Sequence, residues 1–231
     1  MRVDLSLYVL VDPARAGGRA LPDIAAAAVR GGATLVQLRD KERETRALVN
    51  EARGIKRALA GLRVPLLIND RVDVALASGA DGVHLGRDDL DLATARRLLG
   101  PRAIIGASLR SRADIEALVL GAIDYVCIGG VFATSSKDNP DPPIGVDGFR
   151  RLAGIVRERA PGLPVGAIAG IDENNAAEVM RAGADGIAVI SAVTAAADPE
   201  AAARRLKAIV DAVCNERLVR SSLSPVGRGM G

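Results

Sequence analysis

The sequence predicts an α/β protein with the (β/α)8 architecture, a TIM barrel. Short runs of β-branched and apolar residues alternate with longer runs rich in Ala, Leu and Arg. A Gly-Ala junction also recurs before four of the apolar runs. Eight repeating units in about 210 residues give about 26 residues each, close to the lower size limit of such a barrel. These features together favour one closed barrel of repeated units.

The expected strands are short and almost entirely apolar, which is typical of parallel sheets covered on both faces. They cover residues 5–11, 34–39, 65–69, 82–85, 103–107, 125–129, 164–169 and 186–190. Helices are expected near residues 20–31, 44–60, 72–79, 91–99, 111–121, 147–160 and 174–183, with an eighth at about 199–216. The chain therefore alternates strand and helix throughout.

The recurring junction supports repeated units. It reads Gly31-Gly-Ala-Thr34, Gly79-Ala-Asp81, Gly121-Ala-Ile-Asp124 and Gly183-Ala-Asp185, each before an apolar strand. A glycine there suits a left-handed helix C-cap. Any α/β protein would supply one or two such matches, whereas four in one order indicate repetition. A doubly wound sheet would place a glycine-rich turn directly after the first strand, where Val11-Asp-Pro13 stands.

Length and composition bound the domain count and the compartment. The 231 residues are 49% hydrophobic, which is enough for one well-buried core. No run approaches the length of a membrane span, and the N-terminus lacks a cleavage-site pattern, so we expect a cytoplasmic protein. Residues 1–216 are expected to form one catalytic barrel domain and residues 217–231 a disordered basic tail. Cys127 and Cys214 make no disulfide framework, and the single His84 excludes a histidine-rich metal site.

The net charge of +3 belongs to the expected tail. Residues 217–231 carry Arg217, Arg220 and Arg228 and no acid, so the barrel itself is balanced. Two Tyr, two Phe and no Trp leave little for nucleic-acid bases to stack on. We therefore predict small-molecule substrates, no nucleic-acid partner and no membrane partner, and leave self-association into a homo-oligomer open.

Polar residues gather at the carboxyl ends of the second to fifth strands, where such barrels place their active sites. They are Gln37, Arg39 and Lys41 after the second strand, Asn69 and Asp70 after the third, Asp89 after the fourth and Ser108 after the fifth. Carboxylates beside cations indicate Mg²⁺ with a diphosphate. The metal takes carboxylate and phosphate oxygens, and the cations neutralise the remaining charge.

A second anion site is predicted after the last two strands. Gly170 permits close backbone approach, and Ser191 offers a hydroxyl and an N–H group. A helix that begins near Asn174 or Asn175 would direct its N-terminus there. A plain tight turn and a helix N-cap are the alternative interpretations of these two residues. Their coincidence at the expected strands favours phosphate binding.

The longest βα loop follows the sixth strand. Thr134, Ser136 and Lys137 lie in it, before a Pro-rich stretch that ends at about Pro143. The alternative to a functional loop is a solvated polar turn. Loops of this length in a compact barrel are more often functional, so we expect this one to close over a phosphorylated ligand.

Several of these motifs resemble the thiamine phosphate synthase family. The motifs are Gln37-Leu-Arg-Asp-Lys41, the block from Leu67-Ile-Asn-Asp70 to His84-Leu-Gly86, Thr134-Ser-Ser-Lys137, Asp141-Pro-Pro-Ile-Gly145 and the run from Ala182-Gly-Ala-Asp-Gly to Ser191. The resemblance extends from about Tyr8 to Pro199. The Asn-Asp to His-Leu-Gly block is specific, whereas the Gly-Ala-Asp-Gly junctions alone are weak.

The resemblance implies a reaction. A hydroxymethylpyrimidine diphosphate would lose pyrophosphate in a dissociative step through a pyrimidine carbocation, and the ring nitrogen of hydroxyethylthiazole phosphate would attack to give thiamine monophosphate. The protein's task would be to stabilise the leaving group, hold the second ring and exclude water.

The resemblance also implies residue roles. The pyrimidine diphosphate would be held by Gln37, Arg39, Lys41, Asn69, Ser108 and Lys137, of which Arg39, Lys41, Ser108 and Lys137 form the catalytic set. Magnesium would be held by Asp70 and Asp89. The thiazole phosphate would be held by Thr134, Ser136, Gly170, Ile190 and Ser191.

The chain departs from the family pattern at three places. Gly130 stands where a Pro is usual, Ala169 where a Gly is usual, and Leu109-Arg110 where a His commonly follows Ser108. None of these changes removes a cation or a metal carboxylate. The runner-up is a thiazole tautomerase-like relative, which would use a His for proton transfer and lack the diphosphate and magnesium set. A non-catalytic phosphate-binding barrel is the alternative from another class.

Overall fold

The computed structural model describes residues 3–135 and 142–223, which contain a closed barrel of parallel strands in chain order. The strands are β1 (Leu7–Val11), β2 (Leu35–Leu38), β3 (Leu66–Asn69), β4 (Gly82–Leu85), β5 (Ile104–Leu109), β6 (Tyr125–Ile128), β7 (Val165–Ile168) and β8 (Gly186–Val189). The barrel closes at β1, where Tyr8 lies opposite Leu35 of β2 and Ala188 of β8. The predicted (β/α)8 fold is confirmed.

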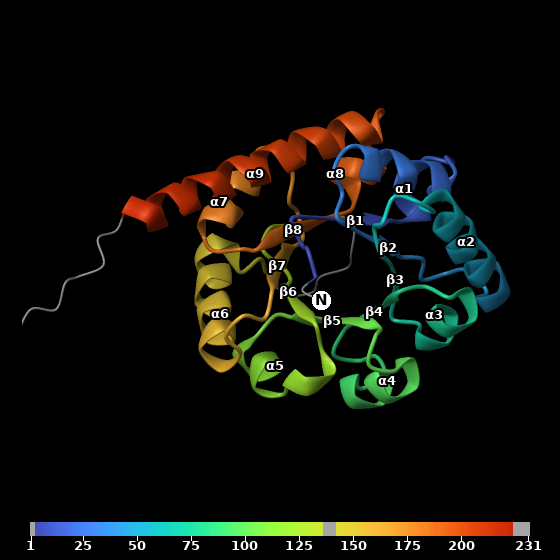
Figure 1. Cartoon of the computed structure of the whole chain (residues 1–231), viewed down its shortest axis with the longest axis horizontal. Coiled ribbons are helices and arrows are strands. Elements are labelled where there is room, and N and C mark those ends of the chain that lie inside the picture. The colour runs from blue at the N-terminus through green and yellow to red at the C-terminus, as the bar shows by residue number, and fades with distance from the viewer. Residues whose placement is uncertain (1–2, 136–141, 224–231) are drawn as a thin grey trace, which may run out of the picture.

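Helices form a ring around the barrel (Figure 1). They are α1 (Leu21–Arg30), α2 (Thr45–Ala58), α3 (Val72–Ser78), α4 (Leu92–Leu99), α5 (Arg112–Glu116), α6 (Gly145–Arg159), α7 (Ala176–Arg181), α8 (Ser191–Thr194) and α9 (Pro199–Leu223), with short 3-10 turns at Pro13–Arg15 and Leu120–Ala122. The helix expected at 111–121 ends at Glu116, and the rest of the segment leaves helical geometry at Val119 before the separate 3-10 turn at Leu120–Ala122. No helix among the described residues is long and apolar enough to cross a membrane.

The C-terminal boundary differs from the prediction. Helix α9 runs along α7, α8 and α1 and continues past residue 216, so residues 217–223 are helical rather than part of a disordered tail (Figure 1). Arg217 donates a hydrogen bond of 2.9 Å to the carbonyl oxygen of Ala184, and Arg181 pairs with Glu216 at 3.2 Å. These contacts hold the end of α9 against the barrel. Residues 224–231 lie outside the described residues.

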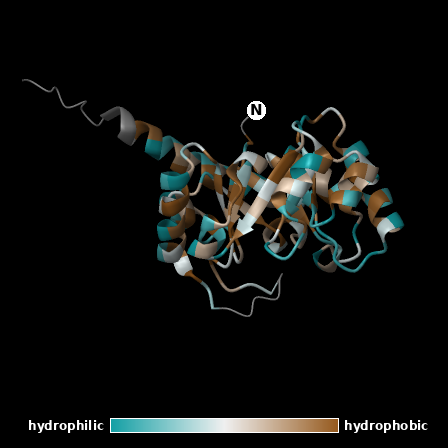
Figure 2. Ribbon diagram, turned by 90° about the horizontal axis from the view of Figure 1, so that it is seen from below, coloured by the Kyte–Doolittle hydropathy of each residue, from teal (hydrophilic) through white to brown (hydrophobic). Residues whose placement is uncertain are grey.

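Apolar side chains form two separate cores. The larger core lies between the strands and the helices, and Figure 2 shows brown strands there flanked by helices with teal turns. The smaller core fills the barrel interior and includes Tyr8, Leu35, Tyr125 and Cys127. Two tyrosines among so few residues make this interior the more polar of the two cores.

The recurring junctions serve the end of the barrel where the strands begin. The carboxylates of Asp81, Asp124 and Asp185 each accept a hydrogen bond of 2.8 Å from a backbone N–H near the start of the preceding strand. Thr34 accepts an equivalent bond of 3.1 Å from Leu7. Each aspartate also pairs with a basic residue: Lys56 at 2.7 Å, Arg96 at 2.6 Å and Arg157 at 3.4 Å. The repeat therefore satisfies backbone groups that a strand start would leave open.

Candidate active site

A cavity of about 630 Å³ opens where the strands end. All the site residues predicted within the described part of the chain line it: Gln37, Arg39, Lys41, Asn69, Asp70, Asp89, Ser108, Thr134, Gly170, Ile190 and Ser191. Ser136 and Lys137 lie outside the described residues. The volume is typical of small-molecule sites.

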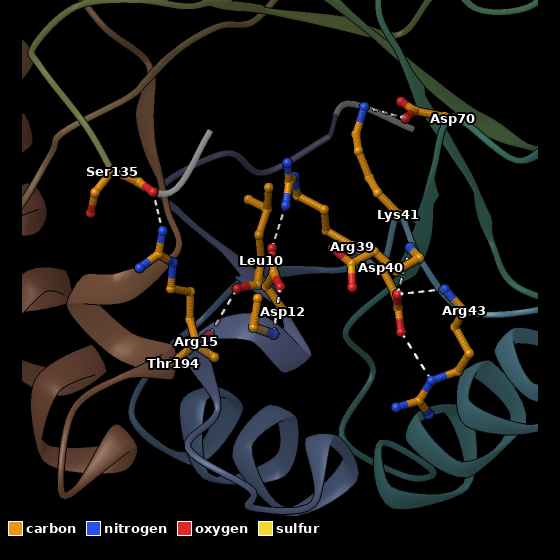
Figure 3. Close-up of polar contacts among 12 residues, drawn as sticks. Leu10, Asp12, Arg15, Arg39, Asp40, Lys41, Arg43, Asp70, Ser135 and Thr194 are labelled. Atoms are coloured by element: carbon orange, nitrogen blue, oxygen red, sulfur yellow. Dashed lines mark hydrogen bonds and ion pairs between the residues drawn. The ribbon is translucent and has the colours of Figure 1, made fainter. Parts of the chain in front are cut away.

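The side chains that follow β2 point alternately to opposite sides (Figure 3). Arg39 forms an ion pair with the buried carboxylate of Asp12, and Lys41 reaches Asp70 at 3.1 Å. Asp40 turns the other way and pairs with Arg43 at 3.0 Å. The sequence analysis missed Asp12, which also accepts a hydrogen bond of 2.9 Å from the backbone of the turn after β1. The sequence feature that could have identified Asp12 is its position as a single carboxylate between an apolar strand and Pro13.

Asp70 and Asp89 lie close together at the ends of β3 and β4. Asp70 has a φ of 61°, a left-handed conformation that aspartate tolerates better than most residues and that often marks functional sites. Asp89 accepts a hydrogen bond of 2.6 Å from the backbone N–H of Gly86. Burial, followed by a hydrogen bond with Asp70, raises the pKa of Asp89. The pair concentrates negative charge next to Lys41.

This pair of carboxylates supplies the kind of ligand atoms that a hard divalent cation binds. Carboxylate oxygens are the ligands that Mg²⁺ prefers, and Mg²⁺ commonly uses one or two of them together with water and phosphate oxygens. Within the described residues no group of three or more His, Cys, Asp or Glu side chains gathers in a metal-binding arrangement. Asp70 and Asp89 therefore fit a cation that shares its coordination with a bound phosphate.

A buried polar cluster below the cavity was not foreseen from the sequence. The His84 ring lies 2.8 Å from the Tyr125 hydroxyl through Nδ1 and 2.9 Å from the Ser108 hydroxyl through Nε2. The hydroxyl oxygens of Tyr125 and Tyr8 are 3.0 Å apart, and Gln37 donates to Tyr8. His84 is buried, and only 6% of it is exposed. The sequence feature that could have revealed this cluster is the presence of one polar residue inside each of several otherwise apolar strands.

The opposite side of the cavity presents mainly backbone. Gly170 has a φ of 65°, and a Cβ there would lie 2.3 Å from the carbonyl oxygen of Ala133. The helix predicted from Asn174 or Asn175 begins at Ala176 as α7, and neither Ala176 nor its N-cap residue Asn175 lines the cavity. The four-residue helix α8 begins at Ser191, which does line the cavity. It was missed because it is too short to show a hydrophobic period.

Asn175 has a different role from the one expected. Its side-chain amide donates a hydrogen bond of 2.9 Å to the carbonyl oxygen of Gly170. Arg15 donates to the carbonyl oxygen of Ser135, so the turn after β1 contacts the loop after β6 (Figure 3). Both contacts hold loops around the cavity in place.

The departures from the family pattern have structural consequences. Gly130 has a φ of 71°, which proline cannot adopt, and a Cβ there would lie 2.9 Å from the guanidinium of Arg110. Arg110 therefore occupies space that a side chain at position 130 would need. Ala169 has a φ of 93°, a conformation that favours glycine, so the methyl group adds backbone strain beside Gly170.

Comparisons with known proteins agree with this geometry. The family model described as thiamine monophosphate synthase matches residues 7–193. A thiamine-phosphate synthase of Agrobacterium fabrum is 52% identical over 216 residues, covering 94% of this chain and 98% of that protein. One of Chloroflexus aurantiacus is 47% identical over 208 residues, covering 90% and 94%.

A solved structure gives the same result. The thiamine phosphate pyrophosphorylase of Pyrococcus furiosus superposes with a TM-score of 0.79 at 36% identity, covering 92% of this chain and 98% of that chain. The family model spans most of the chain, and both relatives exceed 40% identity over nearly its whole length. The chain belongs to the thiamine monophosphate synthase family of transferases.

Proposed function

We propose that this chain joins hydroxymethylpyrimidine diphosphate to hydroxyethylthiazole phosphate, giving thiamine monophosphate and pyrophosphate. The observation that carries the proposal is one cavity lined by two chemically unlike groups of residues. One wall holds Arg39, Lys41 and the carboxylates Asp70 and Asp89, and the other presents Gly170 and Ser191. A diphosphate suits the first wall, because it needs both cations and a metal. A monophosphate suits the second.

In this proposal the carbon–oxygen bond to the diphosphate breaks before the new bond forms. The electron pair leaves with pyrophosphate, and the thiazole nitrogen then supplies its lone pair to the pyrimidine carbon. Arg39, Lys41 and Lys137 offset the charge that develops on the leaving group. Ser108 donates a hydrogen bond to the same group, while Gln37 and Asn69 orient the pyrimidine ring. No general base from the protein is required.

Asp70 and Asp89 would hold Mg²⁺ in this scheme. Bound there, the metal would supply charge neutralisation for the diphosphate. Lys41, 3.1 Å from Asp70, offsets part of the negative charge of the pair. Thr134, Ser136, Gly170, Ile190 and Ser191 would bind the thiazole phosphate and fix its ring nitrogen near the reacting carbon.

The tautomerase alternative is less well supported by the geometry. It requires a histidine that transfers a proton to and from the ligand. His84 is the only histidine of the chain, and both of its ring nitrogens lie within hydrogen-bond distance of hydroxyl groups of the protein. A ring held in this way is better placed to orient Ser108 than to exchange protons with a ligand.

The test is a reconstituted reaction. Purified protein with Mg²⁺ and both substrates is expected to release thiamine phosphate and pyrophosphate in equal amounts. Omitting either substrate, or adding a chelator, should abolish both products. Conversion of a thiazole phosphate alone, with no pyrophosphate released, would favour the tautomerase. Binding of both phosphorylated ligands without either product would favour a non-catalytic barrel.

A further inference from the structure

The turn after β1, residues 12–20, contacts both walls of the cavity from behind. None of these described residues lines the cavity. Asp12 pairs with Arg39 on one wall, whereas Arg19 reaches the end of α8 on the other. Arg39 and Ser191, the first residue of α8, both line the cavity. One turn outside the cavity therefore contacts elements of both walls.

Arg19 donates all of its side-chain hydrogen bonds to backbone carbonyl oxygens. Its Nη2 atom donates to Thr194 at 2.5 Å and its Nη1 atom donates to Ala196 at 2.7 Å, both at the C-terminal end of α8. Its Nε atom donates to Ala16 at 2.9 Å within the turn itself. A guanidinium group is planar and rigid, so these three bonds fix the end of α8 relative to the turn.

Helix α8 depends on such outside contacts. It has four residues, and isolated helices shorter than about 12–15 residues are marginal in water. The buried hydroxyl of Thr194 donates a hydrogen bond of 2.8 Å to the carbonyl oxygen of Leu10 (Figure 3). The N–H of Thr194 donates one of 2.8 Å to the carbonyl oxygen of Ile190, which lines the cavity. A shift of the Thr194 backbone would therefore move Ile190 and Ser191 as well.

Gly17 and Gly18 shape the turn that carries Arg19. Their φ angles are 60° and 78°, and a Cβ at either position would meet nothing within 4 Å. Glycine is therefore needed for the left-handed backbone and not for space. The turn brings the N–H of Arg19 to 3.2 Å from the carbonyl oxygen of Ala16, the oxygen that also accepts from Nε. These two bonds direct the Arg19 side chain toward α8.

We propose that Arg19 is a positioning residue for the wall of the cavity that α8 forms. Its guanidinium holds the end of α8 and so fixes Ile190 and Ser191, although Arg19 itself does not line the cavity. Asp12 has the corresponding role at the opposite wall through its ion pair with Arg39. That the α8 wall takes the thiazole phosphate rests on the proposed function. The two residues of one turn therefore affect different substrates.

The test compares KM for each substrate in Arg19→Ala and Asp12→Asn. Arg19→Ala is expected to raise KM for the thiazole phosphate about 3- to 30-fold, because α8 loses its fixed position. The other KM, and kcat at saturation, are expected to stay within about twofold. Asp12→Asn keeps an acceptor for the N–H of Ala14 but loses the ion pair with Arg39, so KM for the diphosphate is expected to rise instead. An unchanged KM for the thiazole phosphate in Arg19→Ala, or an equal rise for both substrates, would overturn the proposal.

Arg19→Lys is the conservative variant. A lysine keeps the charge but has one nitrogen atom, which cannot reproduce the fork between Thr194 and Ala196. We expect its KM for the thiazole phosphate to lie between the values of the wild type and Arg19→Ala. The same substrate-specific rise is read from Arg19→Lys alone if Arg19→Ala does not fold. A wild-type KM in Arg19→Lys would show that the fork is not needed and would overturn the proposal.

Arg157→Ala is the matched control for a general loss of stability. Arg157 also donates from its guanidinium to a carbonyl oxygen near β8, that of Gly183, but at the end of the barrel where the strands begin. We expect it to lower the melting temperature by roughly 2–8 °C, as Arg19→Ala does, and to leave both KM values unchanged. A rise in KM for the thiazole phosphate as large as that in Arg19→Ala would show that lost stability explains the effect, and would overturn the proposal.

Titration calorimetry measures the binding of each phosphorylated ligand without turnover, and so separates this inference from the proposed function. Product formation by the wild type, with no substrate-specific effect of Arg19→Ala, would reject the role of Arg19 alone. Weaker binding of only the thiazole phosphate by Arg19→Ala, when the wild type forms no product, would support the role of Arg19 and reject the proposed function alone.

Discussion

The two ends of the barrel use aspartates with basic partners for opposite purposes. Where the strands begin, Asp81, Asp124 and Asp185 each have a carboxylate occupied by a backbone N–H and a Lys or Arg side chain. Where the strands end, Asp70 and Asp89 lie beside each other instead, and burial and Asp70 raise the pKa of Asp89. Residue type does not distinguish the two ends. The distinction is that each aspartate at the strand starts has a basic partner of its own, whereas Asp70 and Asp89 share Lys41.

The largest expected effect on activity comes from the end where the strands finish. Asp70→Ala and Asp89→Ala should each lower turnover by about 100-fold or more, because the diphosphate would lose its metal. The melting temperature should stay within about 2 °C, since removing one of two crowded carboxylates relieves repulsion. Turnover rates of the two variants and the wild type, measured across a Mg²⁺ titration, test this expectation.

Asp88 provides the matched control for this pair. It lies between the same strand end and Asp89, but its side chain is 97% exposed. Asp88→Ala is expected to change turnover by less than about twofold. Near-normal activity of Asp70→Ala or Asp89→Ala at limiting Mg²⁺ would disprove the metal assignment.

At the other end the effect should appear in stability. Asp124→Ala would leave the N–H of Ile105 without its acceptor and would remove the carboxylate partner of Arg96, whose guanidinium keeps its hydrogen bonds to backbone carbonyl oxygens. We expect the free energy of unfolding to fall by about 2 kcal/mol and the melting temperature by roughly 4–8 °C. Turnover at low temperature should not change. Thermal unfolding and initial rates on the same samples test both statements.

Asp124→Asn sharpens the test, because the amide keeps one oxygen acceptor and removes the charge. It should recover about half of the lost stability. If the folded Asp124→Ala protein lost activity to the same degree as Asp70→Ala, the division between the two ends would be wrong.

The sequence predicted the barrel more completely than the site. Strand boundaries agreed within a few residues because buried parallel strands have a plain apolar signature. The repeated junction was recognised, but its role was not, since the hydrogen bond that the N–H of Ile105 donates to Asp124 joins residues from different elements. The same reason hid the ion pair of Arg39 with Asp12. Local sequence places residues at a strand end, and only the closed barrel determines which of them meet.

Two glycines differ in how much space surrounds them, and substituting each one tests the difference between the two ends of the barrel. Gly170 and Gly162 both have positive φ, but a Cβ at Gly170 would meet Ala133 at 2.3 Å, whereas a Cβ at Gly162 would meet nothing within 4 Å. Gly170→Ala must displace the loop after β6, so we expect KM for the thiazole phosphate to rise about 10-fold or more. Gly162→Ala should cost only about 1 kcal/mol of stability. Equal KM values for both variants would remove Gly170 from the phosphate site.

A smaller effect is expected from the contact between Gly130 and Arg110 at the cavity. Gly130→Ala adds strain and also pushes the guanidinium of Arg110, which would lie 2.9 Å from the new Cβ. With Arg110→Ala in the background only the strain remains. The two changes should therefore be non-additive in stability by about 0.5–1.5 kcal/mol. Urea unfolding of both single variants and the double variant measures this coupling, and strict additivity would show that Arg110 moves aside freely.

The end of α9 should give the smallest effect. Ending the chain after Glu216 removes the hydrogen bond from Arg217 to Ala184 at the end where the strands begin, and we expect a loss of about 1 kcal/mol in unfolding free energy. Turnover should be unchanged, because Ala184 precedes β8 and the cavity lies at the other end of that strand. Arg217→Ala should reproduce most of the loss, and ending the chain after Leu223 should reproduce none of it. A substantial fall in turnover on either truncation would show that the C-terminus reaches the cavity. It would then be wrong to assign stability to one end of the barrel and catalysis to the other.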